Sequence, residues 1–381
     1  MNFEKLRSYI DTLPDIGIPF ADCAVALDHE IVFRHSSGFT DAERTKPVSG
    51  DDLFWLFSAT KPITCTAAMQ LVAAGKLGLE DKLSDYIPEF AHMMVQQNGA
   101  IAEAKNPILI RHLFDMTAGF SYDLRAPALL KIRLSHPNAT TLEVVRTLAS
   151  VPLAFEPGTR FRYSLCHDVL AAVIEVVSGL SFRDYLFQNI FEPIGMKDFD
   201  FFLSPEQEAR MTRQFTAQPR FGTFEPRDTV CDYRLTDVYE SGGAGLFGNV
   251  DGYIAFADAM ACGGVAKNGN RILPEEAVRM MGENTLCHAA LFDYRDSPRK
   301  YGYGFGLCCR AHMSPGLSHG ESPVGEFGWD GAAASYVLMD PINHLSIFFG
   351  THVRGCGPAY EKTHPYIRDL VYQELRAEGK I

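Results

Sequence analysis

The two ends of the chain carry alternating and apolar runs typical of strands, next to segments with apolar positions at helical spacing. Residues 2–13 predict a helix, and two extended runs follow at 21–28 and 30–38. The sharp break at Asp28-His29 between these runs predicts a β-hairpin. The C-terminal third shows the same kind of pattern, with predicted strands at 303–310, 334–340 and 344–351, a turn at 341–343 and a closing helix at 359–378.

The middle of the chain, roughly 75–245, is mostly helical in pattern and rich in loops. Strands at both ends with helices between them predict an α/β fold of the α+β type, with an antiparallel sheet built from both chain termini and flanked by helices. We expect a discontinuous sheet domain made of residues 1–75 and 246–381, and a mainly helical domain inserted at 76–245. A small ligand is expected in the cleft between these two domains.

Candidate chemistry begins at Ser58. An apolar run, residues 53–57, leads to this serine at the start of a helix, and Lys61 lies one turn further on the same face. A serine hydroxyl becomes nucleophilic when a neighbouring base takes its proton, and a lysine can do so when desolvation leaves it neutral. The alternative for Ser58 is an ordinary helix N-cap. A second Ser-x-x-Lys, Ser297 to Lys300, lies in a polar segment and is interpreted as a solvated loop.

The charge of the chain limits its partners. With 35 Lys and Arg against 47 Asp and Glu the formal net charge is −12, and no long basic run is present, so nucleic acid is an improbable partner. No stretch of about 18 consecutive apolar residues occurs, so no membrane span is predicted. The opening residues lack the apolar core of a secretory signal, and we expect a cytoplasmic protein. The oligomeric state is left open.

The cysteines and glycines do not predict a cofactor. The 9 cysteines have no regular spacing, which favours buried free thiols over a disulfide framework. The residues that a metal site could gather, Cys287, His288, Cys308, Cys309, His312 and His319, lack a known ligand spacing, and no metal is expected. Residues 243–248 fit G-x-G-x-x-G but follow no predicted strand, so dinucleotide binding is discounted.

Three short motifs together carry a family resemblance. Ser58-x-x-Lys61, Tyr163-x-Leu165 and Trp329-x-Gly331, in this order, resemble the active-site motifs of the serine β-lactamase and penicillin-binding-protein superfamily. The segments 76–90, 112–123 and 241–260 are similar to the class C branch. The resemblance covers nearly the whole chain.

The resemblance implies roles for these residues. Ser58 would be the nucleophile, Lys61 and Tyr163 would share the transfer of its proton, and the backbone N–H groups of Ser58 and Ala332 would form the oxyanion hole. Tyr122 would lie near the nucleophile. Strand alternation, independently of the resemblance, places Trp329 and Gly331 on one face and Asp330 on the other, and Gly331 would leave room for backbone to approach substrate.

Two departures from the family pattern shape the predicted function. Leu165 stands where asparagine is usual and Trp329 where lysine or histidine is usual, and neither makes a charge-assisted hydrogen bond to a carboxylate. The motif with tryptophan is similar to family VIII carboxylesterases, so we expect a serine hydrolase that acts on small apolar esters, or transfers acyl groups to another alcohol, without a cofactor. The alternatives are a β-lactamase or D-amino-acid peptidase, and a catalytically silent binding protein.

Overall fold

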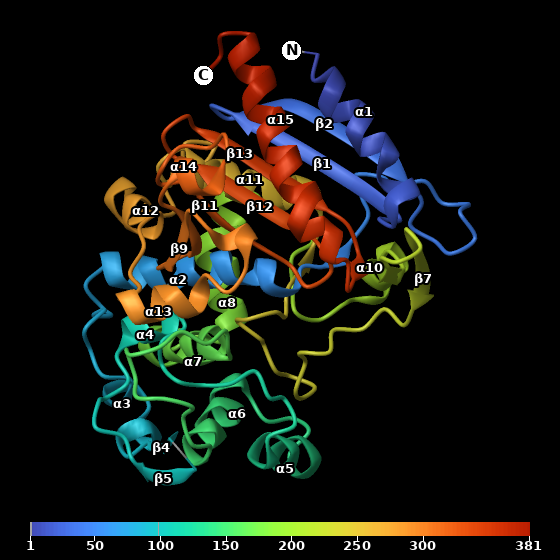
Figure 1. Ribbon diagram of the computed structural model, residues 1–381. Helices are drawn as coiled ribbons and strands as arrows, with labels where there is room; N and C mark the ends of the chain where they lie inside the picture. Colours follow the sequence, from blue (N-terminus) through green and yellow to red (C-terminus); the bar gives the residue numbers. More distant parts are fainter. Residues whose placement is uncertain (1, 98) are drawn as a thin grey trace.

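The computed structural model describes residues 2–97 and 99–381 and contains the antiparallel sheet expected from the two chain ends (Figure 1). The sheet has seven strands. In spatial order they are β2 (Glu30–Gly38), β1 (Phe20–Leu27), β13 (Leu345–Gly350), β12 (Tyr336–Asp340), β11 (Phe327–Asp330), β10 (Cys309–His312) and β9 (Tyr303–Gly306). The prediction of an α/β fold with a sheet built from both termini is therefore confirmed.

Helices cover both faces of this sheet. The first and last helices, α1 (Glu4–Thr12) and α15 (His364–Ala377), lie together on one face, where their apolar side chains pack on those of β1 and β13. The other face packs against α11 (Val250–Ala261) and against α2 (Thr60–Ala73), which begins just after Ser58. Aromatic stacking of Tyr253 on Phe348, at 4.1 Å between ring centroids, joins α11 to β13.

The helices between residues 83 and 186 form a second part of the molecule beyond α2, towards the bottom of Figure 1. Helix α7 (Cys166–Ser178) lies against α2 and carries the contacts to its neighbours. These neighbours are α3 (Leu83–Tyr86), α4 (Ile110–Phe114), α6 (Thr141–Thr147) and α8 (Phe182–Leu186). Helix α5 (Pro127–Ser135) packs on α6, and the hairpin of β4 (Met94–Gln97) and β5 (Ala100–Glu103) lies at the far end. The other helices are α9 (Glu192–Ile194), α10 (Pro205–Arg210), α12 (Glu275–Met281), α13 (His288–Tyr294) and α14 (Pro315–Ser318).

Two small sheets bring distant segments beside Ser58. Strand β3 (Phe54–Trp55) pairs with β8 (Phe247–Gly248) immediately before the serine. Strands β6 (Gln214–Gln218) and β7 (Thr223–Arg227) form a hairpin, and β6 runs parallel to β14 (Val353–Arg354). The inserted region thus returns to the C-terminal part of the chain before residue 245. The domain boundaries at 75 and 245 stay a prediction.

One predicted strand is wrong in detail. Residues 303–310 were expected to form one strand, but the chain turns at Leu307-Cys308 and makes the hairpin of β9 and β10, with Cys309 paired to Gly306. Cys309 adopts a left-handed conformation, with φ of 63°. An apolar run of this kind has no polar turn residue to mark the break, so hydrophobicity alone does not reveal it.

Candidate active site

Ser58 lies in a short 3-10 turn, Phe57–Ala59, between β3 and helix α2. Phe57 is fully buried and has φ of 48°, a left-handed conformation that is strained for a residue other than glycine and that surrounding packing must maintain. The Ser58 hydroxyl caps neither this turn nor α2, so the interpretation of Ser58 as an ordinary N-cap is wrong. Ser58 is 9% exposed, which leaves it within reach of a small ligand.

Lys61 is completely buried on the first turn of α2, and its ammonium group makes three hydrogen bonds. Nζ donates to Ser58 Oγ at 3.2 Å, to the Gly243 carbonyl at 2.6 Å and to Tyr122 Oη at 3.3 Å. Desolvation lowers the pKa of Lys61 to about 8, although the charge of Asp168 acts in the opposite direction. Lys61 is therefore still mostly protonated at pH 7, but its neutral form is far more accessible than that of an exposed lysine.

Aromatic rings form the wall next to Ser58 and Lys61. Tyr163 stacks on Trp329 with centroids 5.6 Å apart, and the indole Nε1–H donates a hydrogen bond to Tyr163 Oη at 3.0 Å. Tyr122 stacks on the other side of Tyr163, at 5.5 Å. Burial raises the pKa of Tyr163, while hydrogen bonds with Ser58 and Trp329 act to lower it. The structure thus brings Ser58, Lys61, Tyr122, Tyr163 and Trp329 into one cluster.

The other residues predicted from the sequence lie around this cluster. Leu165 immediately precedes helix α7, is 4% exposed and packs in the main core. Ala332 packs against the small apolar cluster that contains Phe57, beside the serine turn. Gly331 follows the end of β11, and a Cβ there would collide with the Leu56 carbonyl and with Ser335 Oγ. The space beside Gly331 is therefore filled by the segment that leads to Ser58.

Two residues of this site are absent from the sequence-based set. Gly243 provides the shortest of the three Lys61 hydrogen bonds, and Asp168 is the buried carboxylate behind it. Gly243 belongs to the glycine-rich segment 243–248. Asp168 lies shortly after Tyr163 in the sequence, on the first turn of α7. Their positions depend on the packing of α2 against α7 and the loop before β8, for which a single sequence holds no signal.

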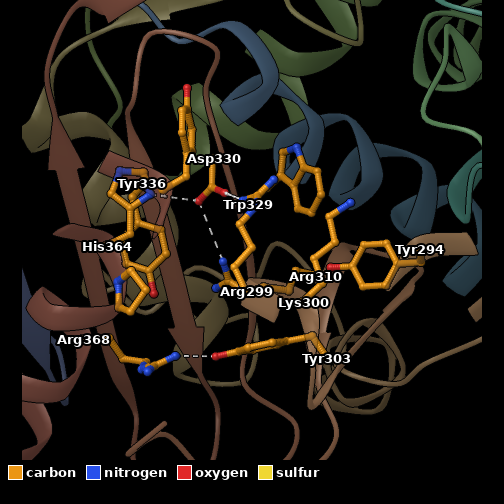
Figure 2. A pocket seen from close by; sticks show the side chains of 12 residues that line it. Tyr294, Arg299, Lys300, Tyr303, Arg310, Trp329, Asp330, Tyr336, His364 and Arg368 are labelled. Carbon is orange, nitrogen blue, oxygen red and sulfur yellow. Dashed lines mark hydrogen bonds and ion pairs between the residues drawn. The ribbon is translucent and has the colours of Figure 1, made fainter. Parts of the chain in front are cut away.

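The pocket in Figure 2 shares Trp329 with this cluster but opens on the other side of β11. Trp329 points to Tyr163, whereas Asp330 faces His364 at 3.4 Å and Arg310 at 3.8 Å. Arg299 lies 3.7 Å from the same carboxylate, which Figure 2 shows at the centre of the group. The predicted placement of Trp329 and Asp330 on opposite faces is confirmed. The pocket encloses about 50 Å³ and is a charged pocket separate from Ser58.

Among the described residues, Cys65, His167 and Cys309 place possible metal-ligand atoms within 4.8 Å of one another behind Lys61. His167 Nε2 lies 3.0 Å from the Phe114 carbonyl, so this nitrogen is engaged as a hydrogen-bond donor. All the cysteines are free thiols. No helix in the described part of the chain has the length and apolar character needed to cross a bilayer.

Comparison with known proteins agrees with this geometry. Esterase EstB of Burkholderia gladioli is 30% identical over 373 residues, covering 91% of this chain and 89% of EstB. A putative D-alanyl-D-alanine carboxypeptidase of Escherichia coli K12 is 26% identical, covering 91% of this chain and 82% of that protein. The solved structure of EstCE1, a hydrolase with promiscuous acyltransferase activity, superposes with a TM-score of 0.80 at 25% identity, over 97% of this chain and 98% of EstCE1. Residues 6–372 match the Beta-lactamase family, and the chain belongs to that family.

Proposed function

We propose that this chain is a serine carboxylesterase that works through a covalent acyl-enzyme on Ser58. The observation that carries the proposal is the hydrogen bond from the fully buried Lys61 ammonium to Ser58 Oγ, at 3.2 Å. A buried lysine with a lowered pKa beside a partly accessible serine is the arrangement that nucleophilic catalysis requires. EstB and EstCE1, an esterase and a hydrolase, are similar to this chain over nearly its whole length.

The reaction would proceed in two steps. Ser58 Oγ attacks the ester carbonyl as its proton passes to Lys61 or Tyr163, and the backbone N–H groups of Ser58 and Ala332 stabilise the oxyanion. The leaving alcohol takes up that proton. Water, or a second alcohol, then attacks the acyl-enzyme with the same groups moving its proton. Because Lys61 Nζ lies 4.6 Å from the ring centroid of the half-buried Tyr163, their titrations are coupled.

The substrate class follows from Trp329. Its N–H group already donates to Tyr163, and its ring presents an apolar surface without a positive charge. An ester with an uncharged acyl group is therefore favoured over a substrate whose carboxylate needs a cation at this position. The name of EstCE1 mentions acyltransferase activity, which supports transfer to an added alcohol as a second outcome of the acyl-enzyme.

Two other functions remain as alternatives. A D-amino-acid peptidase or β-lactamase is supported by the relative named as a putative D-alanyl-D-alanine carboxypeptidase. A silent binding protein would keep the same fold without turnover. The contact between Lys61 and Ser58 argues against the silent protein, because a binding platform does not need a buried lysine against a serine hydroxyl.

The test compares two serines that share the same motif spacing. Hydrolysis of a short-chain p-nitrophenyl ester is measured for wild type, for Ser58→Ala and for Ser297→Ala, the control in the second Ser-x-x-Lys. We expect Ser58→Ala to lose at least a thousandfold in kcat, and Ser297→Ala to keep wild-type activity. Only wild type and Ser297→Ala should react with a fluorophosphonate probe.

A chromogenic cephalosporin and an added alcohol separate the alternatives. Cephalosporin hydrolysis as fast as ester hydrolysis would favour the β-lactamase. A new ester formed in the presence of the alcohol would establish acyl transfer. Absence of turnover and of probe labelling in wild type would overturn the proposed esterase and favour the binding protein.

A further inference from the structure

Asp168 is a fully buried carboxylate on the first turn of α7. Its Oδ1 accepts hydrogen bonds from Tyr239 Oη at 2.9 Å and from Ser241 Oγ at 2.6 Å. Its Oδ2 is buried, receives no side-chain hydrogen bond, and lies against the backbone of Gly243. A buried charge is costly unless an opposite charge lies nearby.

Asp168 Oδ2 lies against the residue that holds Lys61. A Cβ placed on Gly243 would come within 2.5 Å of Asp168 Oδ2 and within 2.9 Å of Tyr122 Oη. The carbonyl of the same glycine accepts the 2.6 Å hydrogen bond from Lys61 Nζ. Asp168, Gly243 and Lys61 therefore form a short series of contacts that ends at the proposed base of Ser58.

The other groups that face Lys61 are neutral at pH 7. They are Tyr122 and Tyr163, the thiols Cys65 on α2, Cys166 on α7 and Cys309 on β10, and the imidazole His167. Burial raises the pKa of each phenol and thiol and lowers the pKa of His167 to about 3, so none of them carries charge. Burial raises the pKa of Asp168 too, whereas its hydrogen bond from Ser241 and the charge of Lys61 act to lower it. In its ionised form Asp168 places a negative charge beside the protonated form of Lys61.

We propose that Asp168 is a positioning residue for Lys61. Asp168 packs against the backbone of Gly243, whose carbonyl binds Lys61 Nζ, and it is the buried counter-charge of the ammonium group. This inference rests on the proposed esterase and deepens it. The side-chain hydrogen bonds of Asp168 come from Tyr239 and Ser241, not from Ser58. Its role is to keep the lysine protonatable in a fully desolvated position, so that Lys61 can both accept a proton and return it.

The sign of the effect follows from the charges. Desolvation lowers the pKa of Lys61, and Asp168 opposes that change. Replacing the carboxylate by a neutral amide leaves desolvation unopposed, so the pKa of Lys61 falls. If neutral Lys61 is the base, the acidic limb of the pH profile moves to lower pH. If Tyr163 is the base and Lys61 must stay cationic, the alkaline limb moves to lower pH instead.

The experiment measures kcat/KM for p-nitrophenyl ester hydrolysis against pH for wild type, Asp168→Asn and Asp115→Asn. Asp115 is a matched control because it is also buried and also accepts from hydroxyl groups, those of Thr117 and Thr285. We expect one limb to move by about one pH unit in Asp168→Asn, with both limbs unmoved in Asp115→Asn. A lower rate with unmoved limbs would reduce Asp168 to a packing role and overturn the proposal.

A milder variant and a direct titration complete the test. Tyr239→Phe removes one donor to Asp168 Oδ1, so it should shift the same limb in the same direction by a smaller amount, and it replaces Asp168→Asn should that variant fail to fold. The pKa of Lys61 is read independently by NMR of protein carrying carbon-13 at lysine Cε, with the Lys61 signal identified by its absence in Lys61→Met. An unchanged Lys61 pKa overturns the role of Asp168. If wild type does not hydrolyse the ester at all, that result counts against the proposed esterase and not against the role of Asp168.

Discussion

At the scale of single residues, Trp329 is the point where this chain departs most clearly from a β-lactamase pattern. The indole N–H donates to Tyr163 Oη at 3.0 Å, and the ring packs edge-on against Phe305 at 5.2 Å. This hydrogen bond holds the phenol oxygen in place and favours its ionised form. The N–H group of Trp329 is thus engaged with Tyr163, and the indole carries no positive charge.

Replacing Trp329 by Phe tests this hydrogen bond. Trp329→Phe keeps an aromatic ring against Phe305 but loses the donor, so we expect kcat to fall about tenfold, the equivalent of one hydrogen bond to a group that develops charge. The measurement is kcat for a p-nitrophenyl ester at several pH values. The other tryptophan of the chain, Trp55, is the control, because its buried Nε1 has no hydrogen-bond partner. Equal losses in both variants would show that ring packing matters and the hydrogen bond does not.

The sequence predicted the reacting groups better than their partners. The serine and lysine could be recognised because a helical turn places residues three apart on one face, whatever the rest of the fold does. Gly243 and Asp168 could not, because they meet Lys61 only through the packing of separate segments. Leu165 is expected near the substrate and is 4% exposed, packed in the main core, so its contact with a substrate stays a prediction.

At the scale of elements, the end of β11 connects the sheet to the serine turn. Trp329 and Asp330 point to opposite faces, and Gly331 then brings the chain against the Leu56 carbonyl. Tyr360 from the C-terminal segment also donates to the Gly331 carbonyl, at 2.8 Å. The position of Ala332 relative to Ser58 therefore depends on a contact for which only glycine is small enough.

Gly331→Ala should disrupt this contact. The added methyl group collides with backbone, which cannot rotate away, so we expect a loss of about 2 kcal/mol in the free energy of unfolding and a larger relative loss of kcat as Ala332 moves. Urea unfolding and ester turnover measure the two effects. Gly316→Ala in α14 is the control, since a Cβ there meets open space, and it should leave both unchanged. Full activity in Gly331→Ala would mean that the serine turn tolerates this shift.

The elements of the sheet were predictable to different degrees. The β1–β2 hairpin was found because Asp28 and His29 interrupt two clear strand patterns, and both adopt positive φ in the turn. The β9–β10 hairpin was missed because its turn lies inside an apolar run. The strands at 214–218 and 223–227 were missed as well, since β6 owes its strand partly to pairing with β14, far away in the sequence.

At the scale of the whole molecule, buried carboxylates link stability to pH. Burial raises the pKa of Glu240 to about 7, although Oε2 accepts a hydrogen bond from the Arg183 backbone N–H at 2.7 Å. An unfolded glutamate titrates near pH ~4.3. Ionising Glu240 in the folded state therefore costs stability, which falls as the pH rises from about 4.3 towards 7 and stays lower above that range.

Glu240→Gln should remove this cost. We expect the variant to be more stable than wild type by about 1–2 kcal/mol at pH ~8 and nearly equal to it at pH ~5. Urea unfolding at the two pH values measures the difference. Glu276→Gln is the control, because Glu276 is an exposed glutamate paired with Arg279 and should change stability little at either pH. An increase in the free energy of unfolding that is the same at both pH values would show that packing at position 240, and not ionisation of the glutamate, lowers the stability of wild type.

The pairing of β1 with β13 also sets the point during synthesis at which the sheet can be completed. The β1–β2 hairpin and the helix that follows Ser58 leave the ribosome long before β13 (Leu345–Gly350), the strand that must lie beside β1. At a translation rate of about 5–20 residues per second, tens of seconds pass between the two. During that interval an apolar strand waits with a free edge, open to chaperones or to another nascent copy. The proposed nucleophile, Ser58, is thus withheld from chemistry until β13 has been made and paired with β1.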